Sequence, residues 1–262
     1  MHNFDFVKPS TIADAVKALS ADGAQALSGG QTLTPTMKQR LAAPSVLVSL
    51  TGIAEMKGVC MGADGLSIGA ATTHATVAKE AAAHYPALAA LAGGIGDPAV
   101  RNRGTIGGSL ANNDPAACYP AGTLGSGATI VTNRRKIAAD DYFQGLFTTA
   151  LEEGEIITGV TFPVPQKAAY VKFNQPASRF ALTAVFVAKF ADGVRVAVTG
   201  ASNEGVFRWS DAEKALSANF TASAVDGLTV DASNLIGDLH GTPAYRANLV
   251  KVLTKRAVAA AH

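Results

Sequence analysis

Two short segments, far apart in the chain, each place a pair of adjacent glycines among hydroxyl or amide side chains. They are Ser28-Gly29-Gly30-Gln31-Thr32 and Thr105-Ile106-Gly107-Gly108-Ser109. Glycine has no Cβ, so backbone N–H groups at such positions can approach an anion closely, and consecutive turn amides form an anion-binding nest. Two interpretations stand side by side: each pair makes only a tight turn, or the two segments together hold a phosphate-bearing ligand.

A third glycine segment matches a well-known pattern but lacks its context. Residues 94–99, Gly-Ile-Gly-Asp-Pro-Ala, fit the G-x-G-x-x-G/A fingerprint of Rossmann dinucleotide sites. That fingerprint must follow a strand and open a helix. Here an alanine- and leucine-rich helix is predicted from Pro86 onward, and Arg-Asn-Arg-Gly at 101–104 does not continue an apolar-striped helix. We therefore reject the Rossmann interpretation.

The order of predicted elements indicates an α+β protein with three parts. Thr11 and Asp14 fit a helix-opening capping pattern ahead of an apolar stripe that runs to Leu19. Two apolar runs, 180–190 and 194–199, flank Ala-Asp-Gly and predict a β-hairpin in the last part. We expect boundaries near residues 51 and 155, which gives units of 1–51, 52–155 and 156–262.

Composition excludes several classes of protein. The chain has 262 residues, 48% hydrophobic and 16% charged, which is the reverse of a disordered sequence. A net charge of +2 provides no electrostatic footprint for nucleic acid. The absence of a long apolar run predicts no membrane span, and the N-terminal residues do not resemble a signal peptide, so we expect a cytoplasmic protein. Its two cysteines, Cys60 and Cys118, are too few for a four-thiolate iron–sulfur or zinc site.

Several motifs in fixed order resemble one family. They are SGGQTL at 28–33, MKQRL at 37–41, IGAATTHATVA at 68–78, RNRGTIGGSLANNDPAA at 101–117, GEII at 154–157 and YVKF at 170–173. Across nearly its whole length the chain resembles the FAD-binding medium subunits of molybdenum hydroxylases, which include carbon monoxide, aldehyde and purine dehydrogenases and the flavin domain of xanthine dehydrogenase. It departs from the pattern at Thr32, where serine is commoner, and at Asn112-Asn113, which replace His-Ala or Asn-Ala.

The resemblance implies a fold and a set of cofactor contacts. FAD would lie non-covalently between two N-terminal α/β subdomains, beside a C-terminal α+β domain with an antiparallel sheet. The glycine segments would grip the pyrophosphate, and Asp114 would face a ribose or ribityl hydroxyl. The implied FAD contacts are Ser28, Gly29, Gly30, Gln31, Thr32, Leu33, Thr73, Thr105, Ile106, Gly107, Gly108, Ser109, Asp114, Ile157 and Lys172. No catalytic residue and no metal ligand is implied on this chain.

The same resemblance implies a division of labour among subunits. A large subunit would carry the molybdenum cofactor and a small subunit the [2Fe–2S] clusters, in a heterotrimer that is often doubled. Electrons would pass from the clusters to the FAD of this chain and on to a quinone, NAD, oxygen or another acceptor. The alternative is an autonomous FAD-dependent oxidase or reductase, which would need a base over the flavin, and the sequence offers no convincing residue for it.

Three charged or titratable residues near these motifs have open roles. His74 follows two threonines, and a structural role is favoured over proton transfer because electron transfer into a flavin needs little acid–base help. Arg101 and Arg103 would either offset pyrophosphate charge or form salt bridges at the surface.

Overall fold

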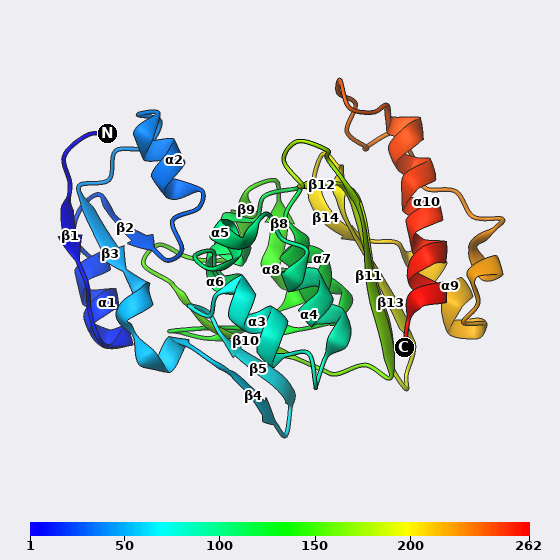
Figure 1. The fold of residues 1–262 in the computed structure, drawn as a ribbon, viewed down its shortest axis with the longest axis horizontal. Coiled ribbons are helices and arrows are strands. Elements are labelled where there is room, and N and C mark those ends of the chain that lie inside the picture. Colours follow the sequence, from blue (N-terminus) through cyan, green and yellow to red (C-terminus); the bar gives the residue numbers. More distant parts are fainter.

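The computed structural model describes residues 1–262, and the three larger of its four β-sheets follow one another along its long axis (Figure 1). The first sheet is parallel, with strands in the order β1 (Asp5–Val7), β3 (Val46–Ser49) and β2 (Ala24–Leu27). Helices α1 (Ile12–Leu19) and α2 (Leu33–Lys38) connect its strands. The Thr11 hydroxyl accepts the N–H of Asp14, which confirms the predicted cap. The SGGQT segment therefore lies where the chain leaves β2 and enters α2.

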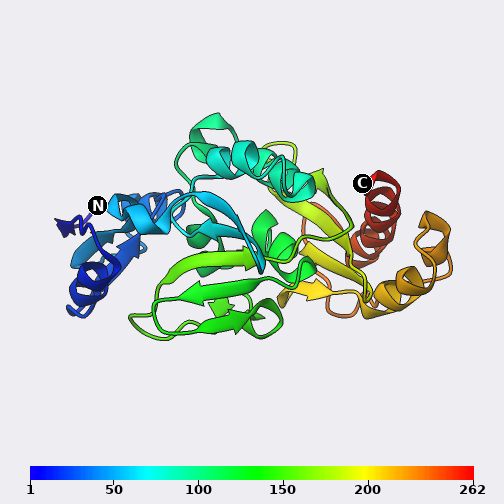
Figure 2. The same cartoon turned by 90° about the horizontal axis from the view of Figure 1, so that it is seen from below.

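The second sheet is antiparallel and takes its central strand from late in the sequence. Its order is β4 (Val59–Gly62), β5 (Gly65–Gly69), β10 (Ile157–Phe162), β6 (Thr129–Thr132) and β7 (Lys136–Ala138). Figure 2 shows these strands in the middle of the molecule, with helices covering one side. The expected boundary near 155 thus falls just ahead of a strand that belongs to this sheet. The remaining elements of this region are α3 (His74–Glu80), α4 (Pro86–Gly93), α5 (Pro98–Arg101), α6 (Ile106–Asn112), α7 (Cys118–Gly125), α8 (Ala139–Tyr142), β8 (Phe143–Gly145), β9 (Thr148–Thr149) and two 3₁₀ turns, Leu50–Gly52 and Ala54–Met56.

Helix α7 forms where local sequence disfavours a helix. It contains Pro120 and two glycines, yet all eight of its residues are buried. Tyr119, Ala121 and Leu124 belong to the larger core cluster, which also includes Phe186 of the third sheet. Tertiary packing stabilises short helices more than propensity does, so this helix depends on its position between the second and third sheets.

The third sheet is an antiparallel meander covered on both faces. Its strands are β11 (Lys167–Asn174), β12 (Ala181–Lys189), β13 (Val194–Ser202) and β14 (Gly205–Arg208). Phe186 and Ala188 face the core that includes α7, whereas Val185 and Val187 face α9 (Ser210–Ala218) and α10 (Pro243–Ala260). A strand buried on both sides needs a continuous apolar run, and residues 181–188 are all buried. The α+β class and the hairpin between β12 and β13 are as predicted from the sequence.

A helix needs about 20 predominantly apolar residues to cross a membrane. The longest, α10, has 18 residues. None of the helices is long and apolar enough to cross a membrane. A further short 3₁₀ segment, Ala222–Val225, packs beside α9 and α10.

Candidate cofactor site

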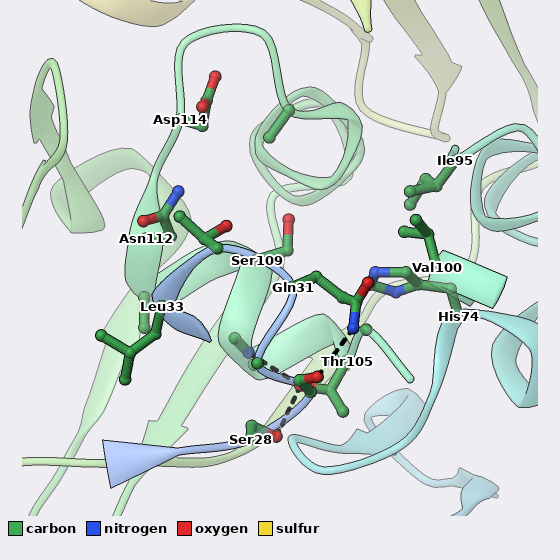
Figure 3. Close-up of a pocket in the computed structure, with 18 of the residues that line it drawn as sticks. Ser28, Gln31, Leu33, His74, Ile95, Val100, Thr105, Ser109, Asn112 and Asp114 are labelled. Atoms are coloured by element: carbon green, nitrogen blue, oxygen red, sulfur yellow. Dashed lines mark hydrogen bonds between the residues drawn. The ribbon is translucent and has the colours of Figure 1, made fainter. Parts of the chain in front are cut away.

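A cavity of about 710 Å³ is lined by residues from all three sheet regions (Figure 3). The first region contributes residues 25–33, the second contributes residues of 95–118 and 151–157, and the third contributes Lys172 and 177–180. Pockets that take cofactors and other small molecules have volumes of roughly 300–1,000 Å³. The site is therefore large enough for a cofactor and is completed only when the three regions come together.

The two glycine segments meet at this cavity and form one wall. The hydroxyls of Ser28 and Thr105 are joined by a hydrogen bond of 2.7 Å (Figure 3). A Cβ on Gly29 would lie 2.3 Å from the carbonyl oxygen of Arg103 and 2.6 Å from Cα of Gly104. Because real Cβ atoms do not approach backbone so closely, glycine at this position is what permits the two segments to touch.

The first segment presents backbone donors that the protein itself leaves unused. No acceptor in the chain takes the N–H groups of Gly29, Gly30 or Gln31, and the Gln31 side chain donates to the Gly29 carbonyl at 3.1 Å. Gly30 has a φ of +70°, a left-handed conformation that favours glycine. Consecutive free amides in such a turn form an anion-binding concavity. This arrangement fits the pyrophosphate of a dinucleotide.

The second segment is built differently from what its motif suggested. Residues 106–112 form α6, and the N–H groups of Ile106, Gly107, Gly108 and Ser109 are all bonded within the chain. A Cβ on Gly107 would lie 2.6 Å from Cβ of Ala70, so this glycine lets α6 pack against the end of β5. A Cβ on Gly108 would lie 3.0 Å from the Thr105 hydroxyl and 3.7 Å from Cβ of Ser28, at the cavity wall. The second segment therefore offers hydroxyls and close backbone approach, while the free amides come from the first.

Thirteen of the fifteen residues implied by the motifs line the cavity, and two do not. Thr73 caps α3, where its hydroxyl accepts the N–H of Thr76. Ile106 is fully buried in the core behind the wall. Neither residue lines the cavity, so the cofactor contacts expected of Thr73 and Ile106 stay predictions. The thirteen lining residues are Ser28, Gly29, Gly30, Gln31, Thr32, Leu33, Thr105, Gly107, Gly108, Ser109, Asp114, Ile157 and Lys172.

Sequence reasoning missed the rim at residues 177–180. The Lys172 ammonium donates to the carbonyl of Gly94 at 2.6 Å and to that of Arg179 at 3.0 Å, which ties this rim to the second region. Arg179 has a φ of +62°, and Phe180 is half exposed. No glycine, motif or periodic pattern marks this turn in the sequence. Lys172, which was predicted as a cofactor contact, is the one predicted residue that bonds to it. Ile95 and Val100, also missed, add apolar surface to the cavity beside His74 (Figure 3).

His74 is a neutral histidine in the cavity wall. It is 5% exposed, its Nδ1 has no hydrogen-bond partner, and its ring lies 5.3 Å from that of Tyr119. Burial, helped by the charge of Arg101, lowers the pKa of His74 to about 4. Arg101 donates to the carbonyls of Ile95 and Gly96, and neither Arg101 nor Arg103 pairs with a carboxylate. The surface salt bridges considered for these arginines do not form.

A buried carboxylate, Glu155, stabilises the second region next to the cavity. It accepts hydrogen bonds from Thr132 at 2.7 Å, from Arg135 at 3.0 and 3.1 Å, and from the Glu152 N–H at 2.9 Å. The bonds from Arg135 outweigh the effect of burial and lower the pKa of Glu155 to about 2. The group is therefore fully ionised and fully bonded near neutral pH.

We expect Glu155→Gln to lower the free energy of unfolding at pH 7 by about 3 kcal/mol, which is roughly what linkage gives for a pKa held near 2 instead of 4.5. A carboxylate whose pKa is lower in the folded state stabilises the fold above its unfolded pKa. That contribution disappears as pH falls from 4.5 towards 2. Urea unfolding at a series of pH values should therefore show the two proteins converging on acidification. Glu153→Gln, at an exposed neighbour whose carboxylate bonds to nothing, is the control; an equal loss there would contradict the interpretation.

Comparison with known proteins agrees with this geometry. Residues 2–165 match the family described as "FAD binding domain in molybdopterin dehydrogenase". The nicotine 6-hydroxylase medium subunit of Paenarthrobacter nicotinovorans is 35% identical, over 97% of this chain and 95% of that one. The carbon monoxide dehydrogenase medium chain of Afipia carboxidovorans is 34% identical, over 98% and 96%. The structure of reconstituted carbon monoxide dehydrogenase from Oligotropha carboxidovorans superposes with a TM-score of 0.88 at 32% identity, covering 98% of this chain and 97% of that one.

The fold and the cavity, taken with these likenesses, define an FAD-binding flavoprotein. The chain belongs to the family of FAD-binding domains of molybdopterin dehydrogenases.

Proposed function

We propose that this chain binds FAD non-covalently in the cavity and acts as the electron-transfer medium subunit of a molybdenum hydroxylase. The observation that carries the proposal is the hydrogen bond between Ser28 and Thr105, which joins the two glycine segments beside three unused backbone amides. FAD supplies the ability to take up electrons one at a time and to release them in pairs. The protein supplies binding and orientation.

Individual residues have distinct proposed roles toward the cofactor. The amides of Gly29, Gly30 and Gln31 donate to the pyrophosphate, and Ser109 adds a hydroxyl. Asp114 accepts the Ala116 N–H on one carboxylate oxygen at 2.8 Å, which leaves the other free to accept from a sugar hydroxyl. Apolar contacts with the cofactor come from Leu33, Ile157 and the aliphatic part of the Lys172 side chain. The Lys172 ammonium also positions the rim through its bonds to Gly94 and Arg179.

The assembly is proposed by analogy with the relatives. Because those relatives are medium chains, we infer a large subunit with the molybdenum cofactor and a small [2Fe–2S] subunit, in a doubled heterotrimer located in the cytoplasm. We also infer that the chain divides into subdomains according to its three sheets. The last boundary would then follow Phe162 rather than precede β10.

The direct test is the cofactor content of the purified protein. We expect a yellow protein with one FAD per chain, and release of intact FAD on acid precipitation, because the cavity is large enough for a cofactor and three consecutive backbone amides are left unbonded in its wall. Chromatography of the supernatant against FAD and FMN standards provides the measurement. Recovery of FMN alone, or of flavin that stays attached to the precipitate, would contradict the proposal.

A further inference from the structure

The cavity segment from Asp114 to Cys118 is held in place by the third sheet. Asp114, Ala116, Ala117 and Cys118 all line the cavity. The hydroxyl of Thr199, on β13, lies 2.9 Å from the carbonyl oxygen of Pro115 and 2.9 Å from that of Ala117. Thr199 is 0% exposed. A single buried hydroxyl thus contacts two carbonyls of a segment that lines the cofactor site.

A bulge next to Thr199 adds a second attachment. The register of β13 against β14 shifts between Val198 and Ser202, and Gly200 within that stretch has a φ of +82°. Its N–H donates to the Pro115 carbonyl at 2.7 Å. Bulges redirect backbone groups out of the regular ladder, and here the redirected groups are the ones that reach the cavity segment.

Arg246 of α10 fixes the bulge from the opposite side. This arginine is buried, and it donates to the carbonyls of Leu182 and Gly200, the latter at 2.8 Å. It also pairs with Asp238 at 2.7 Å. The same residue, Gly200, therefore accepts a hydrogen bond from the C-terminal helix and donates one to the cavity segment.

We propose that Thr199 is a positioning residue for the cofactor: through the hydrogen bond that its single hydroxyl proton donates to the carbonyl of Pro115 or of Ala117, or shares between the two, the C-terminal sheet sets the placement of Asp114 and hence the affinity for FAD. The inference rests on the proposed function. Thr199 does not line the cavity, so it acts only through the segment it holds. A buried acceptor that loses its donor is costly, and the segment is expected to shift when the hydroxyl is removed.

The test compares three variants of the full chain, each stripped of flavin and titrated with FAD. Thr199→Val keeps the volume and removes the hydroxyl, and we expect it to weaken FAD binding about tenfold, the effect of losing one buried hydrogen bond. Thr199→Ser restores the hydroxyl and is expected to bind within about twofold of the wild type. Thr183→Val is the matched control: it is equally buried, on the adjacent strand, and its hydroxyl bonds only to the neighbouring Leu182 carbonyl.

Thermal unfolding of the flavin-free proteins separates positioning from general stability. Wild-type affinity in Thr199→Val, or an equal loss in Thr183→Val, would overturn the inference. Thr199→Ala repeats the measurement should the valine variant not fold. A wild-type chain that binds no FAD would instead overturn the proposed function, and the inference with it.

Discussion

Replacing Gly29 by valine is expected to weaken FAD binding by about 100-fold or more, since overpacking against rigid backbone costs a few kcal/mol. The added Cβ would lie 2.3 Å from the Arg103 carbonyl, and neither this oxygen nor Cα of Gly104 belongs to a flexible side chain that could move away. The two glycine segments would have to separate, and the hydrogen bond between Ser28 and Thr105 would break with them. The purified variant should be folded and almost colourless.

The measurement is FAD titration of flavin-free protein, together with circular dichroism to establish folding. Gly227→Ala is the control, because a Cβ there meets no atom within 4 Å and the backbone is not in the left-handed region. Normal FAD occupancy in a folded Gly29→Val protein would show that contact between the two segments is not required for binding.

The second large effect concerns dependence on partner subunits. We expect the flavin of the isolated chain to be reduced by organic substrates about 1,000-fold more slowly than in the intact complex, because the demanding chemistry resides in the partners' cofactors. Efficient general bases have a pKa near the working pH. The buried histidine and the buried glutamate of the cavity do not: the pKa of His74 is about 4 and that of Glu155 about 2.

Stopped-flow absorbance provides the comparison, with carbon monoxide and nicotine, the compounds in the names of two relatives, as the panel. The isolated chain and the co-purified complex are mixed with each compound in turn, and chemical reduction by dithionite confirms that both flavins are competent. Rapid bleaching of the isolated chain by any of these compounds would favour an autonomous flavoenzyme over an electron-transfer subunit.

The sequence predicted the site best where backbone conformation alone decides the outcome. Gly30, with a φ of +70°, marks a turn that favours glycine, and its neighbours Ser28 and Thr32 line the cavity. The hairpin at Ala191-Asp192-Gly193 and the cap at Thr11 are likewise local features. Each of these features is determined by a few consecutive residues, so it can be predicted from the sequence without knowledge of distant contacts.

Features that depend on distant partners could not be predicted in this way. The segment 105–109 looks like a second phosphate loop, yet its amides are bonded to Ala70, Thr72 and Thr105 because the end of β5 lies beneath it. The rim at 177–180 lies at the cavity beside Lys172, which donates to the carbonyls of Gly94 and Arg179. Neither arrangement can be predicted from composition or periodicity, since the contacting residues lie far apart in the chain.

The position of β10 has a consequence for how the protein is made on the ribosome. A nascent chain that has reached residue 156 holds both halves of the second sheet, β4–β5 and β6–β7, but not the strand that joins them. The halves are joined only when β10 (Ile157–Phe162) pairs with β5 on one side and β6 on the other. Ile157 of this strand also lines the cavity. A chain that ended before residue 157 would therefore lack the central strand of the second sheet, the cavity residue Ile157 and the whole of the rim at 177–180.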